Sequence, residues 1–232
     1  MNRSSLFLAT LILIGTALLI VFGISSLPAA APDATNADQA AAVAPLDVPS
    51  VLFGNPVRGR QDAKVTVVEF GDYQCQPCQE MDDSLGQILK DFPDDVRVVW
   101  KDFPDTSSHK EALTAAIAVR CAGLQDAFWE YHDLLLANQT SINASAYGIF
   151  ANQLGLDEVS FAGCLKDEAT KPVVERDFEE GRGLRIDATP YLFINKRRVS
   201  GVLRYELLKE MVRIEVDRAK AAGSADQPAG QP

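Results

Sequence analysis

The chain has 232 residues and a formal net charge of −10 at pH 7, and 47% of its residues are hydrophobic. That length suits one domain of ordinary size with additional segments, and the apolar fraction is sufficient for a sizeable core. The acidic balance argues against nucleic acid as a partner, because nucleic-acid phosphates are bound by clustered Lys and Arg side chains.

The N-terminal 24 residues are the most hydrophobic part of the chain. Arg3 precedes the uncharged run "LFLATLILIGTALLIVFGI", from Leu6 to Ile24. As a helix this run would cross a hydrocarbon core of about 30 Å, and it exceeds the apolar region of about 7–15 residues in a cleaved signal peptide. We therefore expect a transmembrane anchor in residues 1–24, with a cleaved signal peptide as the alternative. Either segment predicts that the rest of the chain is exported, into a compartment that permits disulfides.

Two segments have the composition of flexible, disordered chain. From residue 25 the sequence shifts to Ala, Pro, Asp and Gln, which predicts a linker at 25–53. The final segment, "AAGSADQPAGQP" at 221–232, predicts a disordered tail. We expect one folded domain between them, at 54–220.

Within that domain the spacing of apolar residues predicts strands and helices in the order β-α-β, a helical block, then β-β-α. In chain order, the predicted elements are a strand at 64–70, a helix ending near Phe92, a strand at 96–101, a helical stripe from Leu113 to Leu135 that breaks near Gly123, helices at 144–154, 158–166 and 170–181, strands at 191–194 and 198–201, and a final helix at 205–219.

Two cysteines, Cys75 and Cys78, stand about one helical turn apart in "FGDYQCQPCQE". A zinc site would need four ligands, usually from a second Cys pair or a His pair. The remaining Cys121 and Cys164 stand alone and the two histidines are far apart in the sequence, so we expect no metal. A purely structural disulfide across so short a loop would stabilise the fold little.

The placement of the pair favours redox chemistry. The motif follows a predicted buried strand and opens an amphipathic helix, so Cys75 lies at a helix N-terminus. The unpaired N–H groups and the helix dipole stabilise a thiolate there, and a thiolate is the nucleophile of thiol–disulfide exchange. Pro77 falls in the first turn, where its missing N–H costs nothing. Such a pair carries two electrons itself and needs no bound cofactor.

A second feature lies far along the chain, where Thr189–Pro190 precedes the strand "YLFIN". X-Pro bonds are the peptide bonds that adopt the cis form at small cost. A trans proline at the first residue of a strand is the commoner alternative.

The segments "VTVVEFGDYQCQPC", "VRVVWKDFP", "FWEYHDLLLANQ" and "ATPYLFINKRRVSGV" together resemble the DsbA-like thiol–disulfide oxidoreductases of the thioredoxin superfamily, over roughly Gly54 to Val216. The resemblance implies an α/β thioredoxin fold with an inserted helical domain at about 105–182. It also implies a cis Thr189–Pro190 bond, in a loop that faces the cysteines and binds substrate backbone as an added strand. One departure is Gln76–Pro77 between the cysteines, where strongly oxidising members often have Pro-His. The redox potential therefore stays open.

Glu69 interrupts an apolar strand six residues before Cys75. A buried carboxylate is costly unless it is paired. The resemblance places an acid–lysine pair beneath the active site at Glu69 and Lys101, so we predict that Glu69 is a proton relay for Cys78 with Lys101 as its partner. The alternative is that Glu69 faces solvent on a half-buried strand.

Cys121 and Cys164 both lie on apolar helical faces. Each could be an ordinary buried thiol, although leftover cysteines in an exported domain tend to pair. The resemblance implies a Cys121–Cys164 bridge across the helical insert, which we expect to be structural. His109 and His132 have no nucleophile partner that the sequence reveals.

Together these inferences predict an extracytoplasmic thiol–disulfide oxidoreductase, most simply an oxidase that gives the Cys75–Cys78 disulfide to unfolded, exported proteins. A quinone-linked thiol oxidase in the membrane would restore the disulfide, and the N-terminal segment would supply the membrane contact. Two alternatives stay open. The chain could run the same chemistry as a reductase or isomerase, or it could be a non-catalytic, peptide-binding holdase.

Overall fold

The computed structural model describes residues 47–225. The anchor or signal peptide expected at 1–24, most of the linker expected at 25–53 and the end of the expected tail lie outside the described residues. Within 47–225, no helix combines the length and the apolar character that crossing a membrane requires.

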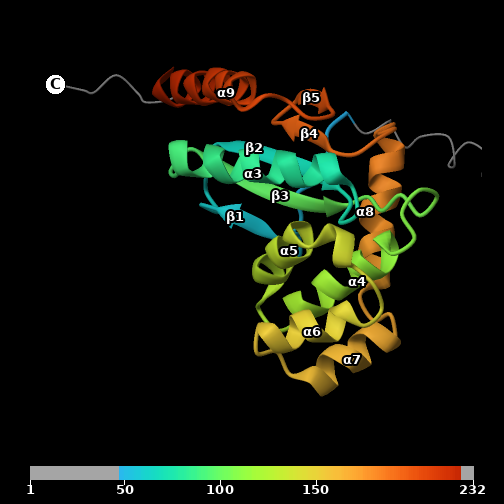
Figure 1. Ribbon diagram of the computed structural model, residues 1–232. Helices are drawn as coiled ribbons and strands as arrows, with labels where there is room; N and C mark the ends of the chain where they lie inside the picture. The colour runs from blue at the N-terminus through green and yellow to red at the C-terminus, as the bar shows by residue number, and fades with distance from the viewer. Residues whose placement is uncertain (1–46, 226–232) are drawn as a thin grey trace, which may run out of the picture. The chain divides into compact units, whose positions relative to one another are not determined.

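A five-stranded mixed sheet lies at the centre, in the order β1-β3-β2-β4-β5 (Figure 1). β2 and β3 are parallel, and the other neighbouring strands are antiparallel. The first edge strand was not predicted, because three residues are too short to show an alternating pattern. The strands are β1 (Val57–Gly59), β2 (Val65–Gly71), β3 (Val96–Asp102), β4 (Tyr191–Ile194) and β5 (Arg197–Ser200).

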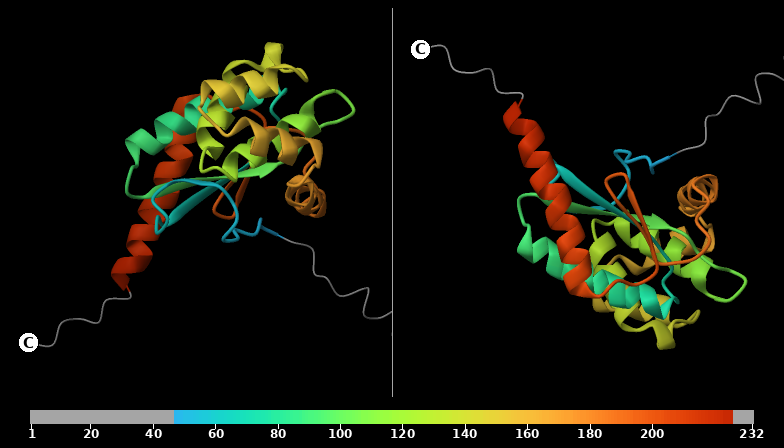
Figure 2. Two further views of the ribbon diagram at one scale, coloured as in Figure 1. Left: turned by 90° about the horizontal axis from the view of Figure 1, so that it is seen from below. Right: turned by 90° about the horizontal axis from the view of Figure 1, so that it is seen from above.

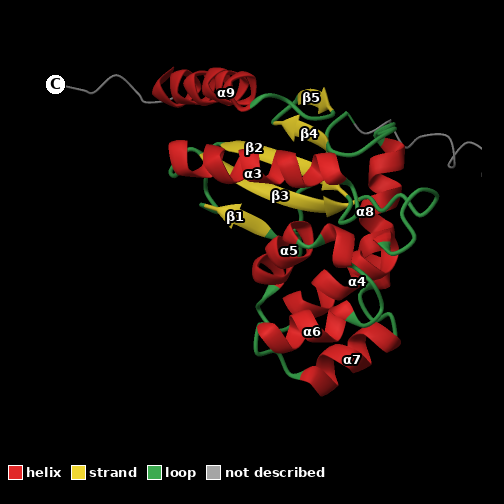
Figure 3. Cartoon of the chain, in the orientation of Figure 1, coloured by secondary structure: helices red, strands yellow, loops and turns green. Residues whose placement is uncertain are grey.

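The helices follow the predicted order, and Figure 3 shows them grouped around and beneath the sheet. The predicted break near Gly123 separates α4 from α5. α9 is longer than predicted, so residues 221–225, expected as the start of a disordered tail, are helical. The helices are α3 (Gln76–Asp91), α4 (Ala112–Gly123), α5 (Phe128–Ala137), the 3-10 turn η1 (Gln139–Ser141), α6 (Ala146–Gln153), α7 (Glu158–Lys166), α8 (Lys171–Gly183) and α9 (Tyr205–Ala225).

The two faces of the sheet are covered by different helices. Alternate strand residues point to opposite faces, so Val65 and Val67 pack with α3 and α9, whereas Val68 and Phe70 face the segment at the end of α8. The views in Figure 2 show α8 on the side of the strands away from α9. This alternation also decides where the polar side chains of β2 and β3 go.

The helices between β3 and β4 form a second core. Tyr131 and Phe161 are buried in it, and so are most residues of α4. The result is a sheet flanked by α3, α9 and α8, with a helical insertion in the chain after β3. The expected thioredoxin fold is confirmed in this part of the chain.

Candidate active site

The cysteine pair sits where β2 passes into α3. Cys75 is the N-cap residue of α3, Pro77 lies in the first turn, and a disulfide joins Cys75 to Cys78. The helix N-terminus therefore points its unpaired N–H groups and positive dipole end at the Cys75 sulfur. Cys78 is fully buried and Cys75 is 5% exposed. The two sulfurs consequently differ in access as well as in electrostatic surroundings.

Hydrogen bonds fix the loop that carries Cys75. Asp72 Oδ1 accepts from the Gln74 N–H at 2.7 Å, and the Asp72 carbonyl accepts from the Cys75 N–H at 3.2 Å. The Cys75 carbonyl accepts from the Cys78 N–H at 3.0 Å and from Gln139 Nε2 at 2.9 Å. The backbone around the reactive sulfur is thus held on both sides, which reduces the reorganisation needed during exchange.

A groove of about 870 Å³ opens in front of Cys75, and Cys78 does not line it. Its apolar wall includes Phe103 and Phe178, whose rings stack at a centroid distance of 4.9 Å. Gln76 and Pro77, the exposed residues between the cysteines, also line the groove. A polypeptide in this groove would meet the sulfur of Cys75 first.

The Thr189–Pro190 loop faces the cysteines. Its peptide bond is cis, as the resemblance implies. The Thr189 carbonyl oxygen lies 3.5 Å from Cys75 Sγ, and Thr189 lines the groove. The structure therefore brings together Cys75, Thr189 and Pro190 from positions more than a hundred residues apart.

Glu69 is completely buried and points toward α3. Its parity on β2 matches that of Val65 and Val67, which pack under that helix. Neither carboxyl oxygen has a hydrogen-bond partner within residues 47–225. Burial, and secondarily the nearby Asp82 carboxylate, raise the pKa of Glu69 well above its usual 4.5. A carboxyl in these surroundings favours its protonated form.

The predicted Glu69–Lys101 pair is wrong. In the parallel ladder Glu69 lies opposite Trp100, and Lys101 lies opposite Phe70. Neighbouring residues of a strand face opposite sides of the sheet, so the Lys101 side chain leaves toward α8. The sequence prediction failed because closeness along two strands does not specify which face each side chain takes.

On that opposite face Lys101 is fully buried with acidic partners. Its Nζ lies 3.3 Å from Asp177 Oδ1 and 2.8 Å from Glu180 Oε2. Burial alone would raise the pKa of Glu180, but the Lys101 ammonium and the Ser50 N–H lower it overall. The lysine therefore forms a buried ionic contact between β3 and α8 and does not line the groove.

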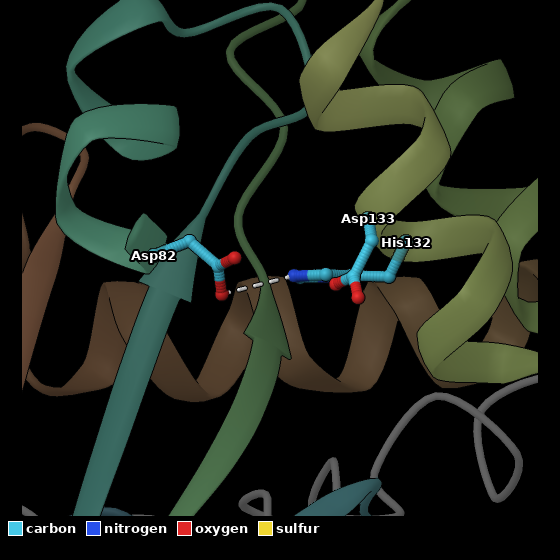
Figure 4. A group of neighbouring side chains, drawn as sticks. All are labelled: Asp82, His132 and Asp133. Atoms are coloured by element: carbon cyan, nitrogen blue, oxygen red, sulfur yellow. Dashed lines mark hydrogen bonds and ion pairs between the residues drawn. The ribbon is translucent and has the colours of Figure 1, made fainter. Parts of the chain in front are cut away.

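Another acid–base pair takes the place beside Glu69. Asp82 of α3 and His132 of α5 point toward one another in Figure 4, with His132 Nε2 3.2 Å from Asp82 Oδ1. The Tyr73 hydroxyl contacts the other ring nitrogen at 2.9 Å. Asp133 lies close enough to share a cation with this pair, but it is engaged with Arg58 at 2.6 Å. Because all of these groups already have protein partners, we assign no metal to them.

Sequence reasoning missed His109, which lies in the loop after β3. Its Nδ1 is 2.9 Å from Asp72 Oδ2, and His109 lines the same groove as Cys75. The only signal in the sequence was an acidic residue three positions before Cys75. Nothing in the spacing indicates that a histidine 34 residues after Cys75 returns to it.

Cys121 and Cys164 form a second disulfide, between α4 and α7, with 43 residues of separation. Cys121 is buried within the core of the helical insertion, and Cys164 packs against that core. Neither residue lines the groove at Cys75. The structure thus keeps the two disulfides in separate surroundings.

Comparison with known proteins agrees with this architecture. The family model described as Thioredoxin matches residues 53–213. The protein named disulfide bond formation protein D of Bacillus subtilis is 29% identical over 174 residues, which cover 71% of this chain and 78% of that protein. The crystal structure of oxidised BdbD from Bacillus subtilis superimposes with a TM-score of 0.63 at 29% identity, covering 71% of this chain and 94% of that one.

A different kind of relative matches this chain over part of a longer sequence. The protein named Na(+)/H(+) antiporter NhaA 1 of Salinispora arenicola is 33% identical over 189 residues, or 76% of this chain. The matched part is 29% of the antiporter's length. The chain therefore spans less than a third of this relative.

Proposed function

The chain belongs to the DsbA-like thiol–disulfide oxidoreductases of the thioredoxin superfamily, and from that premise we propose that it oxidises thiols of exported proteins outside the cytoplasm. The observation that carries this proposal is the pair of unequal sulfurs, with Cys75 at a helix start facing a groove and Cys78 sealed behind it. Unequal access gives a defined site of attack and a defined leaving group.

In the first half of the proposed cycle, a substrate thiolate attacks Cys75 Sγ. A new substrate–Cys75 disulfide forms, the Cys75–Cys78 bond breaks, and its electron pair goes to Cys78. The carboxyl of Glu69 gives its proton to the Cys78 thiolate, which matches a group whose pKa is raised by burial.

In the second half, another thiolate of the same substrate attacks the substrate sulfur of the mixed disulfide. The substrate leaves with a new disulfide, and Cys75 leaves as a thiolate stabilised by the start of α3. The proton of the second substrate thiol returns through solvent to Glu69. The two electrons lost by the substrate remain on the reduced cysteine pair.

The groove and the cis-proline loop suit an unfolded polypeptide as substrate. Phe103 and Phe178 offer an apolar wall, and the backbone at Thr189 offers an edge for strand addition. We further propose that a quinone-linked thiol oxidase in the cytoplasmic membrane restores the disulfide, and that the N-terminal segment keeps the domain near that membrane. No bound cofactor or metal enters this cycle.

The test starts from the oxidised protein and a reduced, unfolded protein that contains two thiols. The wild-type chain is expected to introduce the substrate disulfide, and Cys75→Ser is expected to abolish the reaction. Cys78→Ser cannot form the Cys75–Cys78 disulfide, so it is tested as the free Cys75 thiol against the oxidised form of the substrate. Attack of Cys75 on the substrate disulfide is expected to accumulate a mixed disulfide on Cys75, visible on non-reducing gels. The double variant Cys121→Ala/Cys164→Ala is the matched control and should retain exchange.

The reduction potential of the Cys75–Cys78 couple then separates the directions of the reaction. A value toward about −120 mV supports an oxidase, and a value near about −270 mV supports a reductase. A holdase would suppress substrate aggregation equally well in the Cys75→Ser variant. Retention of substrate oxidation by Cys75→Ser would contradict the proposed function altogether.

A further inference from the structure

We propose that His109, oriented by Asp72, is the acid–base residue for exchange at Cys75, accepting the proton of the substrate thiol and then standing as a cation beside the Cys75 thiolate. This inference rests on the proposed function and deepens it. It assigns a role to an Asp–His pair, with a buried aspartate and a partly exposed histidine, that the cycle above does not use.

The buried carboxylate of Asp72 orients the imidazole. Its side chain is fully buried and accepts from the Gln74 N–H, from the Asp105 N–H at 2.8 Å and from His109 Nδ1 at 2.9 Å. A carboxylate only accepts hydrogen bonds, so the His109 proton lies on Nδ1. The other ring nitrogen, Nε2, is then the acceptor when the imidazole is neutral.

The loop that carries His109 is fastened next to Cys75 at two points. Asp72 binds the Asp105 N–H at the start of the loop, and Gln74 Oε1 accepts from the Glu111 N–H at 2.6 Å at its end. Both of these residues lie within the three positions before Cys75 in the chain. The position of the imidazole relative to the sulfur is therefore set by short, local connections.

The imidazole is open to the groove in which Cys75 is attacked. The His109 side chain is 29% exposed and lines the groove together with Cys75. Within the described part of the chain, its Nε2 has no hydrogen-bond partner. A substrate thiol that approaches Cys75 Sγ through this groove enters a space whose lining includes His109.

The other charged groups near this position have their own partners or lie further along the groove. The Asp105 carboxylate accepts from Ser107 and Ser108, which lowers the pKa of Asp105 to about 2. Glu111 accepts from the Tyr147 hydroxyl. Arg182 of α8 and Asp187 of the following loop also line the groove, and Arg182 pairs with Glu179. Lys110, which follows His109 in the chain, is exposed.

The chemical step is balanced by groups already present. The S–H bond of the substrate breaks and its proton goes to His109 Nε2. The resulting thiolate attacks Cys75 Sγ, and the electron pair of the Cys75–Cys78 bond goes to Cys78. When Cys75 later leaves as a thiolate, the imidazolium beside it favours the charged sulfur. His109 would thereby supply the basic group that Gln76–Pro77 lacks.

The experiment follows reduction of the Cys75–Cys78 disulfide by a dithiol peptide, from about pH 5 to pH 8, the range in which imidazoles change charge. His109→Gln is expected to slow this step at least about tenfold near neutral pH and to remove the limb of the pH–rate profile that belongs to an imidazole. In the reduced His109→Gln variant, the pH dependence of alkylation should also show that Cys75 ionises at higher pH than in the wild-type protein. Asp72→Asn is expected to slow the step in the same direction, because the ring loses its orientation.

Two further variants make the outcome decisive. Lys110→Gln removes a positive charge from the adjacent position and is expected to leave the rate and the pH profile unchanged. His109→Lys keeps a cation but no neutral-pH base, so it should recover part of the Cys75 titration without recovering the pH profile. Circular dichroism and thermal unfolding establish that each variant is folded.

The inference and the proposed function fail separately. If His109→Gln or His109→Lys reacts with the wild-type rate and pH profile while Cys75→Ser is inactive, the role of His109 is overturned and the oxidoreductase stands. If Cys75→Ser still oxidises substrate, the proposed function falls first.

Discussion

The proton-donor role proposed for Glu69 comes with a cost to stability. Its carboxyl lies in the apolar layer between β2 and α3, and neither oxygen has a partner within residues 47–225. Such burial favours the neutral acid, which is the form that can protonate Cys78. The absence of the expected lysine partner strengthens this effect, because a nearby ammonium would favour the carboxylate.

The raised pKa of Glu69 predicts a pH dependence of stability. In the unfolded chain the carboxyl ionises above its usual 4.5, while in the folded chain it stays protonated to higher pH. The neutral carboxyl thus makes its full contribution to the free energy of unfolding below pH 4.5. This contribution is lost as pH rises through the pKa of the folded state. Glu69→Gln should remove this loss. Between pH 4.5 and the folded pKa, the free energy of unfolding of the variant should therefore rise relative to that of wild type, by up to about 1.4 kcal/mol per pH unit.

Urea unfolding of both proteins in a series of buffers from pH 4.5 upward measures this difference. The exposed Glu80 of α3 offers a matched control, since Glu80→Gln should show no such trend. Parallel stability curves for Glu69→Gln and wild type would show that Glu69 is ionised in the folded protein. Exchange by Glu69→Gln should also be slower, because Cys78 loses its proton donor.

At the scale of elements, a buried ionic network joins β3, α4 and α8. Arg120 of α4 contacts Asp102 at 2.6 Å and Asp177 at 2.7 Å, and Asp177 also contacts Lys101. Burial raises the pKa of Asp102, and the Arg120 guanidinium opposes that rise. Through these contacts the insertion helices are fixed against the sheet, and α8 carries Phe178 and Arg182 into the groove.

Lys101→Met is therefore expected to destabilise the protein through its helical contacts. The substitution removes the buried cation of the Glu180 carboxylate and leaves Asp177 with Arg120 as its buried cation. The loss is expected to be up to about 3–5 kcal/mol, the cost of breaking a buried pair. Chemical denaturation measures the loss, with Lys64→Met as the control at an exposed lysine. A loss as small as that of the control would mean that solvent or another cation compensates for Lys101. The thiolate titration of Cys75 should change little, because Lys101 lies on the opposite face.

At the scale of the whole molecule, the two disulfides are suited to different roles, one to stability and the other to thiol–disulfide exchange. The Cys75–Cys78 bridge closes a short loop at a groove, whereas the Cys121–Cys164 bridge closes a loop of 43 residues inside the insertion. By the chain-entropy account a long closed loop stabilises the fold and a short one contributes little. The bridge across the long loop is accordingly suited to structure, and the bridge whose Cys75 lines the groove is suited to exchange.

Cys121→Ala/Cys164→Ala is expected to lower the free energy of unfolding by up to about 4 kcal/mol. The reduction potential of the Cys75–Cys78 couple should remain that of wild type, because the second bridge does not line the groove. Denaturation and a glutathione redox titration of the same sample measure the two quantities. A shifted potential would reveal coupling between the insertion and the active site.

The local sequence was sufficient for the features that depend on neighbouring residues. Apolar periodicity specified the strands and helices, and Cys75, Pro77 and the strand before them specified a cysteine at a helix start. The three-residue β1 escaped because so short a segment has no measurable period. The resemblance supplied Thr189–Pro190, whose relation to Cys75 spans more than a hundred residues.

Only the tertiary structure decided which of these groups meet. The register of β2 against β3 places the Glu69 and Lys101 side chains on opposite faces of the sheet. A shift of the register by one residue would place them on the same face. The loop after β3 brings His109 next to Asp72 through hydrogen bonds that no sequence pattern predicts. Local order follows from nearest neighbours along the chain, whereas contact between distant side chains depends on the register and loop closure of the whole fold.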